Sequence, residues 1–263
     1  MTRRVMVGGV PLGGGARVSV QSMTNTDTRD VPATLAQIRR LHEAGCDIVR
    51  VSVYDEACAK AVRALVDVSP VPLVADIHFD YRLAIASIEN GIAKVRINPG
   101  NIGGRENVRR LADCVKAHHV PLRVGVNAGS LERELLQKYG GPTAEALVES
   151  ALGQARMLED MDVHDIVLSM KASGVRMTVE CCEMAAASCD YPLHVGVTEA
   201  GGGEGAVVKS AIGIGALLLR GIGDTIRVSL TGDPALEVPV CLDILRALGL
   251  REEALPLVHA AGG

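Results

Sequence analysis

Polar residues recur at even intervals near the ends of short apolar runs in this chain. Side chains alternate between the two faces of a β-strand, so residues separated by an even number share a face. Arginine, lysine, asparagine and hydroxyl groups placed in this way can all donate hydrogen bonds to one ligand. The sets are Arg50 and Ser52; Asp76 and His78; Arg96 and Asn98; Arg123, Gly125 and Asn127; Ser169 and Lys171; His194 and Thr198; and Arg227, Ser229 and Thr231.

The charges in these sets do not balance. The strand carboxylates nearby are Asp76 and Glu199, and the formal net charge of the whole chain is −4. A surplus of cations inside an acidic protein indicates an anionic ligand. Arginine forks match phosphate oxygens and lysine adds a point charge, so a diphosphate suits the set better than one carboxylate. The cations are Arg50, Arg96, Arg123, Lys171 and Arg227.

Two residues are candidates for proton transfer. His78 follows an apolar run, where an imidazole can serve as a general acid. Glu199 is the stronger candidate, because burial would raise its pKa. Asp76 fits either a bridge that holds an arginine or a catalytic group, and His194 also fits a hydrogen-bonded core histidine. The predicted catalytic residues are Glu199 and His78; the predicted substrate-binding residues are Arg50, Arg96, Asn98, Arg123, Asn127, Ser169, Lys171, Thr198, Arg227 and Ser229.

Alternating strand and helix patterns must position these residues. Eight strand–helix units predict a (β/α)8 barrel, whose functional groups lie at the C-terminal ends of the strands. An open doubly wound sheet is the runner-up. We expect residues 1–16 to form a hairpin that plugs the barrel bottom, and residues 128–143 to form an ordered insertion. The predicted strands are Val18–Thr24, Asp47–Val53, Pro72–His78, Lys94–Asn98, Pro121–Asn127, Asp165–Lys171, Pro192–Glu199 and Thr225–Thr231.

Glycine-rich segments follow two of the predicted strands. Ile97–Gly104 and Gly201–Gly205 fall at the functional face, where backbone N–H groups can hold phosphate. By contrast, Gly221–Asp224 precedes the last strand, and we interpret its glycines as turn residues at the opposite face. None of these segments predicts a dinucleotide site.

Composition excludes several classes of protein. One Phe, four Tyr and no Trp argue against stacking platforms for nucleic acid, and the acidic balance argues against phosphate-backbone binding. No apolar run reaches the ~20 residues of a membrane span, and no signal peptide is visible, so we expect a cytoplasmic protein. The seven cysteines are scattered without a Cys-x-x-Cys motif, which predicts reduced, mostly buried thiols and no metal site.

Six segments resemble one family closely. The chain resembles 4-hydroxy-3-methylbut-2-enyl-diphosphate synthase of the non-mevalonate isoprenoid pathway from about Val5 to Leu250. The segments that carry the resemblance are Val74–Phe79, Lys94–Gly103, Arg123–Leu131, Ser169–Ser173, Val197–Gly201 and Gly221–Thr231.

The resemblance implies a reductive ring opening. Its substrate would be 2-C-methyl-D-erythritol 2,4-cyclodiphosphate, which two electrons convert to the linear allylic diphosphate. Glu199 matches the acid near the reacting hydroxyl, and His78 lies near the diphosphate. The resemblance places diphosphate contacts at Arg50, Arg96, Arg123, Asn127, Lys171 and Ser229.

The chain also departs from the family pattern. Family members continue into a smaller domain whose cysteines hold a four-iron four-sulfur cluster, and none of the seven cysteines here has that spacing. We therefore expect a substrate-binding barrel over residues 1–250 and a tail over 251–263, with no cofactor bound by this chain. The chain is either a piece of a longer protein or receives the cluster from another chain.

The resemblance further implies partners. A homodimer would place one barrel against the other chain's cluster domain, and a flavodoxin or ferredoxin would supply the electrons. We expect the chain to bind the cyclodiphosphate without turning it over alone. Two alternatives stay open: another anionic-substrate barrel enzyme, such as a pterin-diphosphate synthase, and a noncatalytic diphosphate-binding module.

Overall fold

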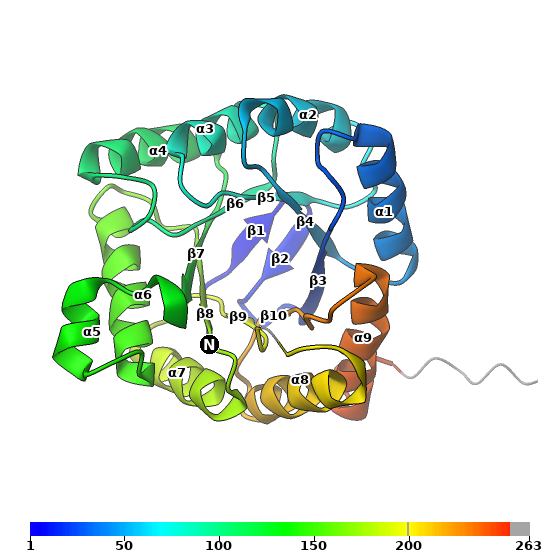
Figure 1. The fold of residues 1–263 in the computed structure, drawn as a ribbon, viewed down its shortest axis with the longest axis vertical. Helices are drawn as coiled ribbons and strands as arrows, with labels where there is room; N and C mark the ends of the chain where they lie inside the picture. The colour runs from blue at the N-terminus through cyan, green and yellow to red at the C-terminus, as the bar shows by residue number, and fades with distance from the viewer. Residues whose placement is uncertain (199, 253–263) are drawn as a thin grey trace, which may run out of the picture.

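Parallel strands run around a central barrel in the computed structural model, which describes residues 1–198 and 200–252 (Figure 1). The strands pair in the order β8-β7-β6-β5-β4-β3-β10-β9. A parallel bridge between Leu168 and Leu193 joins the two ends, where the Leu168 N–H donates to the Pro192 carbonyl at 2.9 Å. The strands are β3 (Ser19–Met23), β4 (Ile48–Ser52), β5 (Leu73–Asp76), β6 (Lys94–Ile97), β7 (Leu122–Asn127), β8 (Ile166–Lys171), β9 (His194–Val195) and β10 (Thr225–Ile226). The predicted (β/α)8 barrel is confirmed.

Helices form the outer layer of the barrel (Figure 1). Several begin where a side chain accepts a hydrogen bond from a free backbone N–H, as Asp55 does from Cys58. Two end before a glycine with positive φ, Gly45 at 102° and Gly91 at 89°, as C-caps require. The helices are α1 (Val31–Glu43), α2 (Glu56–Val66), α3 (Tyr81–Glu89), α4 (Arg105–His118), α5 (Arg133–Tyr139), α6 (Ala144–Glu159), α7 (Val175–Ser188), α8 (Gly203–Leu218) and α9 (Glu237–Ala247).

The main apolar core lies between the strands and these helices. Strand residues such as Val49 and Val51 alternate outward and meet buried helix residues such as Ile38 and Leu41. The polar sets therefore point the other way, into the barrel interior.

The N-terminal residues form the expected hairpin. Strands β1 (Val5–Val7) and β2 (Val10–Leu12) pair antiparallel. Their buried residues, including Leu12, pack against Ile48, Val74 and Val167. Since these three residues lie low on β4, β5 and β8, the hairpin closes the N-terminal end of the barrel, as the sequence predicts.

Some boundaries differ from the predicted ones. The predicted strands Pro192–Glu199 and Thr225–Thr231 are too long, because β9 ends at Val195 and β10 at Ile226. Beyond β10, the Arg227 N–H still donates to the Val195 carbonyl at 3.1 Å, whereas the Leu230 N–H donates to the Glu237 carboxylate at 3.2 Å. Likewise β5 ends at Asp76, so His78 lies in the loop after the strand.

The predicted insertion over residues 128–143 is ordered. It consists of the 3₁₀ turn η1 (Ala128–Ser130) followed by α5. A second 3₁₀ turn, η2 (Pro234–Leu236), precedes α9. No described helix is long and apolar enough to cross a membrane. Most of the predicted tail, residues 253–263, lies outside the described residues.

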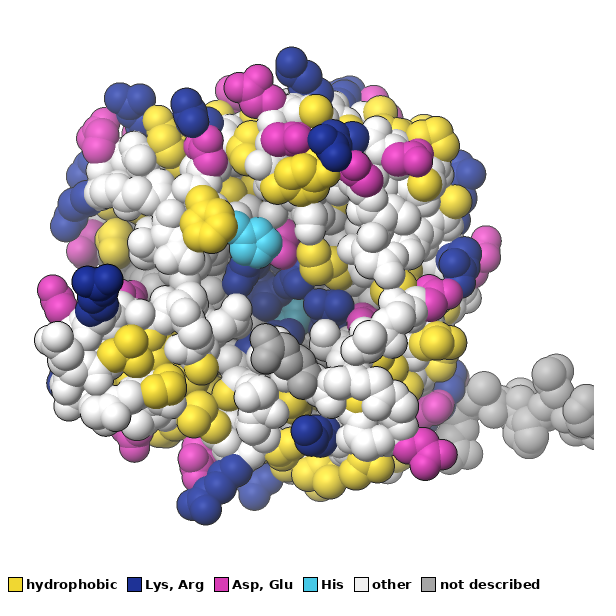
Figure 2. All heavy atoms as spheres, viewed as in Figure 1, with side chains coloured by type: hydrophobic (Ala, Val, Ile, Leu, Met, Phe, Trp, Pro, Cys, Tyr) yellow, Lys and Arg dark blue, Asp and Glu magenta, His cyan; other side chains and the backbone are white. Residues whose placement is uncertain are grey.

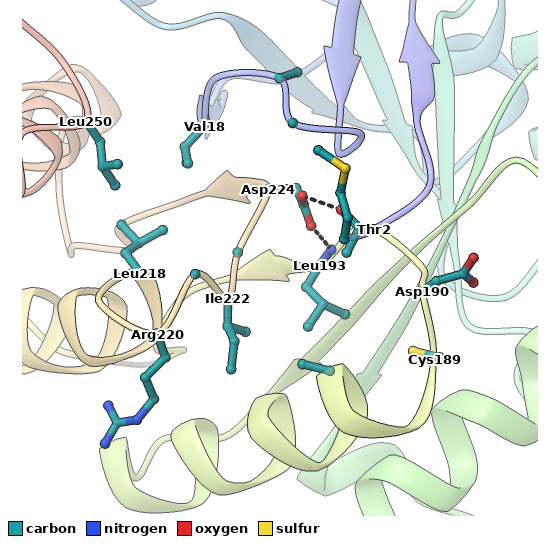
Figure 3. Close-up of a pocket in the computed structure, with 16 residues that line it drawn as sticks. Thr2, Val18, Cys189, Asp190, Leu193, Leu218, Arg220, Ile222, Asp224 and Leu250 are labelled. Atoms are coloured by element: carbon teal, nitrogen blue, oxygen red, sulfur yellow. Dashed lines mark hydrogen bonds between the residues drawn. The ribbon is translucent and has the colours of Figure 1, made fainter.

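The Gly221–Asp224 turn lies at the N-terminal end of the barrel, as the sequence indicates. It lines a cleft of about 500 Å³ together with the chain's first residues (Figure 3). Asp224 accepts hydrogen bonds from the Thr2 hydroxyl at 2.7 Å and the Leu193 N–H at 2.8 Å. Both carboxylate oxygens of Asp224 are thus used to hold the N-terminus and the start of β9 in place.

Candidate anion-binding site

Lysine and arginine side chains gather in the hollow at the centre of the barrel (Figure 2). They come from neighbouring strands, and the strand pairing explains why they meet. Arg96 on β6 lies in register with Asp76 on β5 and with Arg123 on β7. Lys171 on β8 lies in register with Asn127 on β7. Four of the predicted binding residues are thus brought together from three adjacent strands.

Asp76 bridges two of the arginines. Its Oδ1 accepts from Arg96 Nη1 at 3.1 Å, and its Oδ2 lies 3.5 Å from Arg50 Nε. Burial alone would raise the pKa of this carboxyl, but the coulombic attraction of Arg50 and Arg96 outweighs burial and lowers the pKa to about 2. Asp76 is therefore ionised at neutral pH. Of the two roles that the sequence allowed, an arginine bridge or a catalytic group, the geometry shows the bridge.

Arg123 is buried with most of its donors free. Its Nη2 donates to the Ser169 hydroxyl at 2.9 Å, whereas its Nε and Nη1 have no partner among the described residues. Burial, and then the nearby Arg50 and Arg96, lower the pKa of Arg123 well below its usual value. Unpaired donors on a buried cation are costly unless a ligand accepts from them.

Two glycines make room for these long side chains. A Cβ at Gly125 would lie 2.7 Å from Arg96 Nε. A Cβ at Gly196 would lie 2.3 Å from the Arg227 carbonyl oxygen and 3.3 Å from Lys171 Nζ. A larger residue at position 125 would displace the Arg96 side chain, and one at position 196 would clash with the Arg227 backbone, so glycine at these two positions leaves room for the cations.

Lys171 itself is buried beneath the strand ends. Burial, followed by repulsion from Arg123 and Arg227, lowers the pKa of its ammonium group well below the usual value. An incoming anion would favour the charged form of this lysine.

Arg227 is paired, which corrects the charge balance drawn from the sequence. Its Nε and Nη2 donate to the two carboxylate oxygens of Glu237 at 3.2 Å each. Glu237 is the first residue of α9, is buried, and also accepts from the Ser22 hydroxyl at 2.9 Å. The sequence count covered the strand carboxylates Asp76 and Glu199 and so left out Glu237, a helix residue that reaches inward to Arg227.

Two groups deep in the barrel were not among the predicted site residues. Lys94 begins β6 and is fully buried, and its Nζ has no partner in the described part of the chain. His194 on β9 is buried, and neither ring nitrogen has a described partner, so it is not a hydrogen-bonded core histidine. Burial and then Arg123 lower the pKa of both groups. The two-residue spacing of Lys94 and Arg96 was the signal that could have identified Lys94.

The remaining predicted residues surround this centre. The Asn98 amide holds its own loop, donating to the Ser130 hydroxyl at 3.2 Å and accepting from the Gly100 N–H at 3.1 Å. Asn127, Thr198 and Ser229 are half-buried. Glu199 lies outside the described residues.

His78 lies at the rim. Half of its side chain is exposed, and its Nε2 is 3.9 Å from Asp76 Oδ2. The exposed Phe79 ring follows it, 6.0 Å away between ring centroids.

Among the described residues of this cluster, six basic side chains face the two carboxylates Asp76 and Glu237, a formal surplus of four basic groups. The six are Arg50, Lys94, Arg96, Arg123, Lys171 and Arg227. Such a surplus inside a (β/α)8 barrel is typical of a barrel that binds an anion, and most of these groups lie toward the C-terminal strand ends, where barrels of this fold bind their substrates.

Comparison with known proteins identifies the family. The family model described as GcpE TIM-barrel domain matches residues 2–242. The 4-hydroxy-3-methylbut-2-en-1-yl diphosphate synthase (flavodoxin) of Caldanaerobacter subterraneus is 56% identical over 258 residues, which are 98% of this chain and 73% of that protein. The synthase of Geobacter sulfurreducens is also 56% identical, over 98% of this chain and 73% of its own length. The chain belongs to the 4-hydroxy-3-methylbut-2-en-1-yl diphosphate synthase family.

Solved structures with low identity share the fold alone. A dihydropteroate synthase from Xanthomonas albilineans has a TM-score of 0.60 at 15% identity, covering 95% of this chain and 99% of its own. An N-acetylneuraminic acid synthetase from Leptospira borgpetersenii has a TM-score of 0.65 at 11% identity, covering 98% of this chain and 94% of its own.

Proposed function

We propose that this barrel binds 2-C-methyl-D-erythritol 2,4-cyclodiphosphate and holds it for reductive ring opening to 4-hydroxy-3-methylbut-2-enyl diphosphate. The formal surplus of four basic groups inside the barrel carries the proposal. A cyclic diphosphate offers several anionic oxygens within a few ångströms, and these can accept from the free donors of Arg123 and Arg96. The family membership supports the choice of this diphosphate over others.

The overall reaction balances as a two-electron reduction. One ring carbon–oxygen bond breaks, a carbon–carbon double bond forms, and a hydroxyl leaves as water. Counted on the acid forms, two electrons and two protons are consumed. The relatives' printed name points to flavodoxin as the electron donor.

The residues of this chain would bind and position the substrate. Arg50, Arg96, Arg123 and Lys171 would contact the diphosphate, and Asp76 would keep two of those arginines in place. The departing hydroxyl needs a proton, and we assign that role to Glu199 and His78. The groups that would complete the substrate contacts are Asn98, Asn127, Ser169, Thr198, Arg227 and Ser229.

The four-iron four-sulfur cluster of the family does not fit the described residues. Iron–sulfur clusters need converging thiolates, and within residues 1–198 and 200–252 no three His, Cys, Asp or Glu side chains form a metal-binding group. Five of the seven cysteines are buried in the core. The described residues therefore supply no cluster ligands, and we infer that electron transfer requires residues from outside the described barrel, in a homodimer. The barrel alone would bind substrate without turnover.

Isothermal titration calorimetry with the cyclodiphosphate tests the proposal. We expect micromolar binding that weakens between 50 and 200 mM salt, because the attraction is electrostatic. Arg123→Met should weaken binding at least about 100-fold, since it removes buried donors to the charged ligand. The matched control is Arg63→Met, on the exposed side of α2, which should leave the affinity unchanged.

Four results would contradict parts of the proposal. Equal affinity for the wild type and Arg123→Met would place the ligand elsewhere, and preference for a pterin diphosphate would favour the other synthase class. Turnover by the purified chain under anaerobic reducing conditions would show that no outside residues are needed. If Glu199→Gln changed nothing in a reconstituted reaction, the noncatalytic module would be favoured.

A further inference from the structure

One hydroxyl group ties the ends of β6 and β7 together. Ser130 is the last residue of η1, and its Oγ accepts from the Asn98 side-chain amide and from the Asn127 backbone N–H, at 3.2 Å each. The same hydroxyl donates to the Asn127 carbonyl at 3.0 Å. A serine hydroxyl has one proton and two lone pairs, so these three bonds use its whole capacity. Ser130 therefore joins the loop after β6 to the last residue of β7.

Asn98 passes this constraint on to the backbone of its own loop. Its Oδ1 accepts from the Gly100 N–H at 3.1 Å, and its carbonyl accepts from the Asn101 N–H at 2.9 Å. The Asn98 side chain is buried, so these bonds are made away from water. Both ends of a side-chain amide lie in one plane, so a rotation that moves Nδ2 away from Ser130 also moves Oδ1 away from Gly100.

The chain directly after Ser130 is fixed from behind. Leu131 is buried in the main core. The Oε1 of Glu132 accepts from the Ser150 hydroxyl at 3.0 Å and from the Gln154 amide at 2.9 Å, and both of these residues belong to α6. Because α6 holds the segment that follows it, the Ser130 hydroxyl is a fixed point for the groups bonded to it.

We propose that Ser130 is a positioning residue of the substrate site, which holds Asn98 and Asn127 in the arrangement that binds the cyclodiphosphate. The inference rests on the function proposed above, in which Asn98 and Asn127 contact the substrate. Groups that are fixed before the ligand arrives lose less conformational entropy on binding, so preorganisation raises affinity. Ser130 acts through these two residues and makes no contact of its own with the ligand.

Calorimetry with the cyclodiphosphate tests this role. Ser130→Ala leaves the Asn98 amide and the Asn127 N–H without their acceptor, so we expect the dissociation constant to rise about tenfold. Ser130→Thr keeps the hydroxyl and should bring the affinity back to within about threefold of the wild type. Equal affinities of the wild type and Ser130→Ala would overturn the inference.

Ser69→Ala is the matched control. The Ser69 hydroxyl likewise donates to a backbone carbonyl and accepts from a backbone N–H, both of Val71, at 2.7 and 3.4 Å. Ser69 precedes β5 and so lies at the N-terminal end of the barrel, away from the cation cluster. This control should leave the affinity unchanged. Thermal unfolding checks that each variant is folded at the temperature of the titration.

A double-mutant cycle with Asn98→Ala separates positioning from direct contact. If Ser130 acts through Asn98, the effect of Ser130→Ala should fall from about tenfold to about threefold or less in the Asn98→Ala background. The remaining effect would come from the Asn127 N–H. A full tenfold effect in both backgrounds would place the Ser130 hydroxyl on the ligand and overturn the positioning role.

Hydrogen exchange of the ligand-free protein gives a readout that does not depend on the substrate. Ser130→Ala should speed exchange of the Gly100 and Asn127 N–H groups at least about tenfold, and Ser69→Ala should leave both rates unchanged. If these rates rise but the wild type does not bind the cyclodiphosphate, the proposed substrate is wrong and the tie between the two strand ends is supported. Unchanged exchange at Gly100 in Ser130→Ala would overturn the inference whichever ligand the barrel binds.

Discussion

The two ends of this barrel are built from opposite kinds of residue. At the N-terminal end, the hairpin residues Val5, Val7 and Leu12 pack on strand residues, and every member of that cluster is apolar and buried. Toward the C-terminal end, five basic residues share two carboxylates among the described residues, namely Arg50, Arg96, Arg123, Lys171 and Arg227. One end buries apolar surface, worth about 1.5–3 kcal/mol per large side chain, and the other holds charges that oppose folding.

The difference separates stability from binding. The N-terminal end, closed by the hairpin, stabilises the barrel against unfolding. The open C-terminal end keeps hydrogen-bond donors unpaired, so that a ligand can accept from them. Substitutions at the closed end should therefore change the free energy of unfolding and leave affinity alone. Substitutions at the open end should change affinity, and several of them should stabilise the empty protein. We expect one exception at the open end: replacing Asp76 should destabilise the protein.

Asp76→Asn should have the largest effect on stability. It leaves the buried Arg50 and Arg96 without their carboxylate, which should lower the free energy of unfolding by about 3–5 kcal/mol. Urea unfolding at pH 7 measures this loss. The control is Asp67→Asn, an exposed partner of Arg63 on α2, for which we expect less than about 1 kcal/mol.

The same variant has a signature in acid. The pKa of Asp76 is about 2 in the folded protein, below that of an unfolded aspartate near 3.9. Its contribution is therefore fully present above about pH 4 and is lost as pH falls toward 2. The wild type should lose this stability over that interval and Asp76→Asn should not. If the free energies of unfolding of the two proteins fell by the same amount between pH 4 and pH 2, the assignment would be refuted.

Leu12→Ala should have the next largest effect, at the other end. It removes a fully buried side chain from the hairpin cluster, which should lower the free energy of unfolding by about 3 kcal/mol. Affinity for the cyclodiphosphate should stay within about twofold. Met6→Ala, on the outward side of the same hairpin, is the control and should cost less than about 1 kcal/mol. A large loss of affinity in Leu12→Ala would show that the two ends are not separate.

The order of elements and the polar end of the barrel could be predicted from sequence, because both follow from local periodicity. The alternation of side chains along a strand places Arg96 and Arg123 inside the barrel, whatever the exact register of the strands. Asp76 was also recognisable, since a lone acid among arginines has few other roles. Glu237 was not, because a helix residue is expected on the outer layer and its inward reach depends on how α9 packs against β3.

Lys94 shows the second limit of pattern reasoning. A lysine at the start of a strand ordinarily extends into water, and its burial follows from the pairing of β6 with β5, where Lys94 lies beside Val74. Val74 in turn contacts the hairpin. Only the folded barrel shows that the hairpin closes off the water that this lysine would otherwise reach.

Lys94 thus lies where the apolar and cationic ends meet. The stability of Lys94→Met shows whether Lys94 supports the closed end or belongs to the cation cluster. Removing a buried amine without a described partner should raise the free energy of unfolding by about 1–2 kcal/mol at pH 7.

Burial, and then Arg123, hold the pKa of Lys94 well below the value near 10.4 of an unfolded lysine. The unfolded chain therefore binds the extra proton, so wild-type stability should rise with pH across that interval and the advantage of Lys94→Met should shrink toward pH 10. Lys60→Met, at an exposed position of α2, should show neither effect. If Lys94→Met instead lowered stability by several kcal/mol, Lys94 would be a supporting part of the closed end.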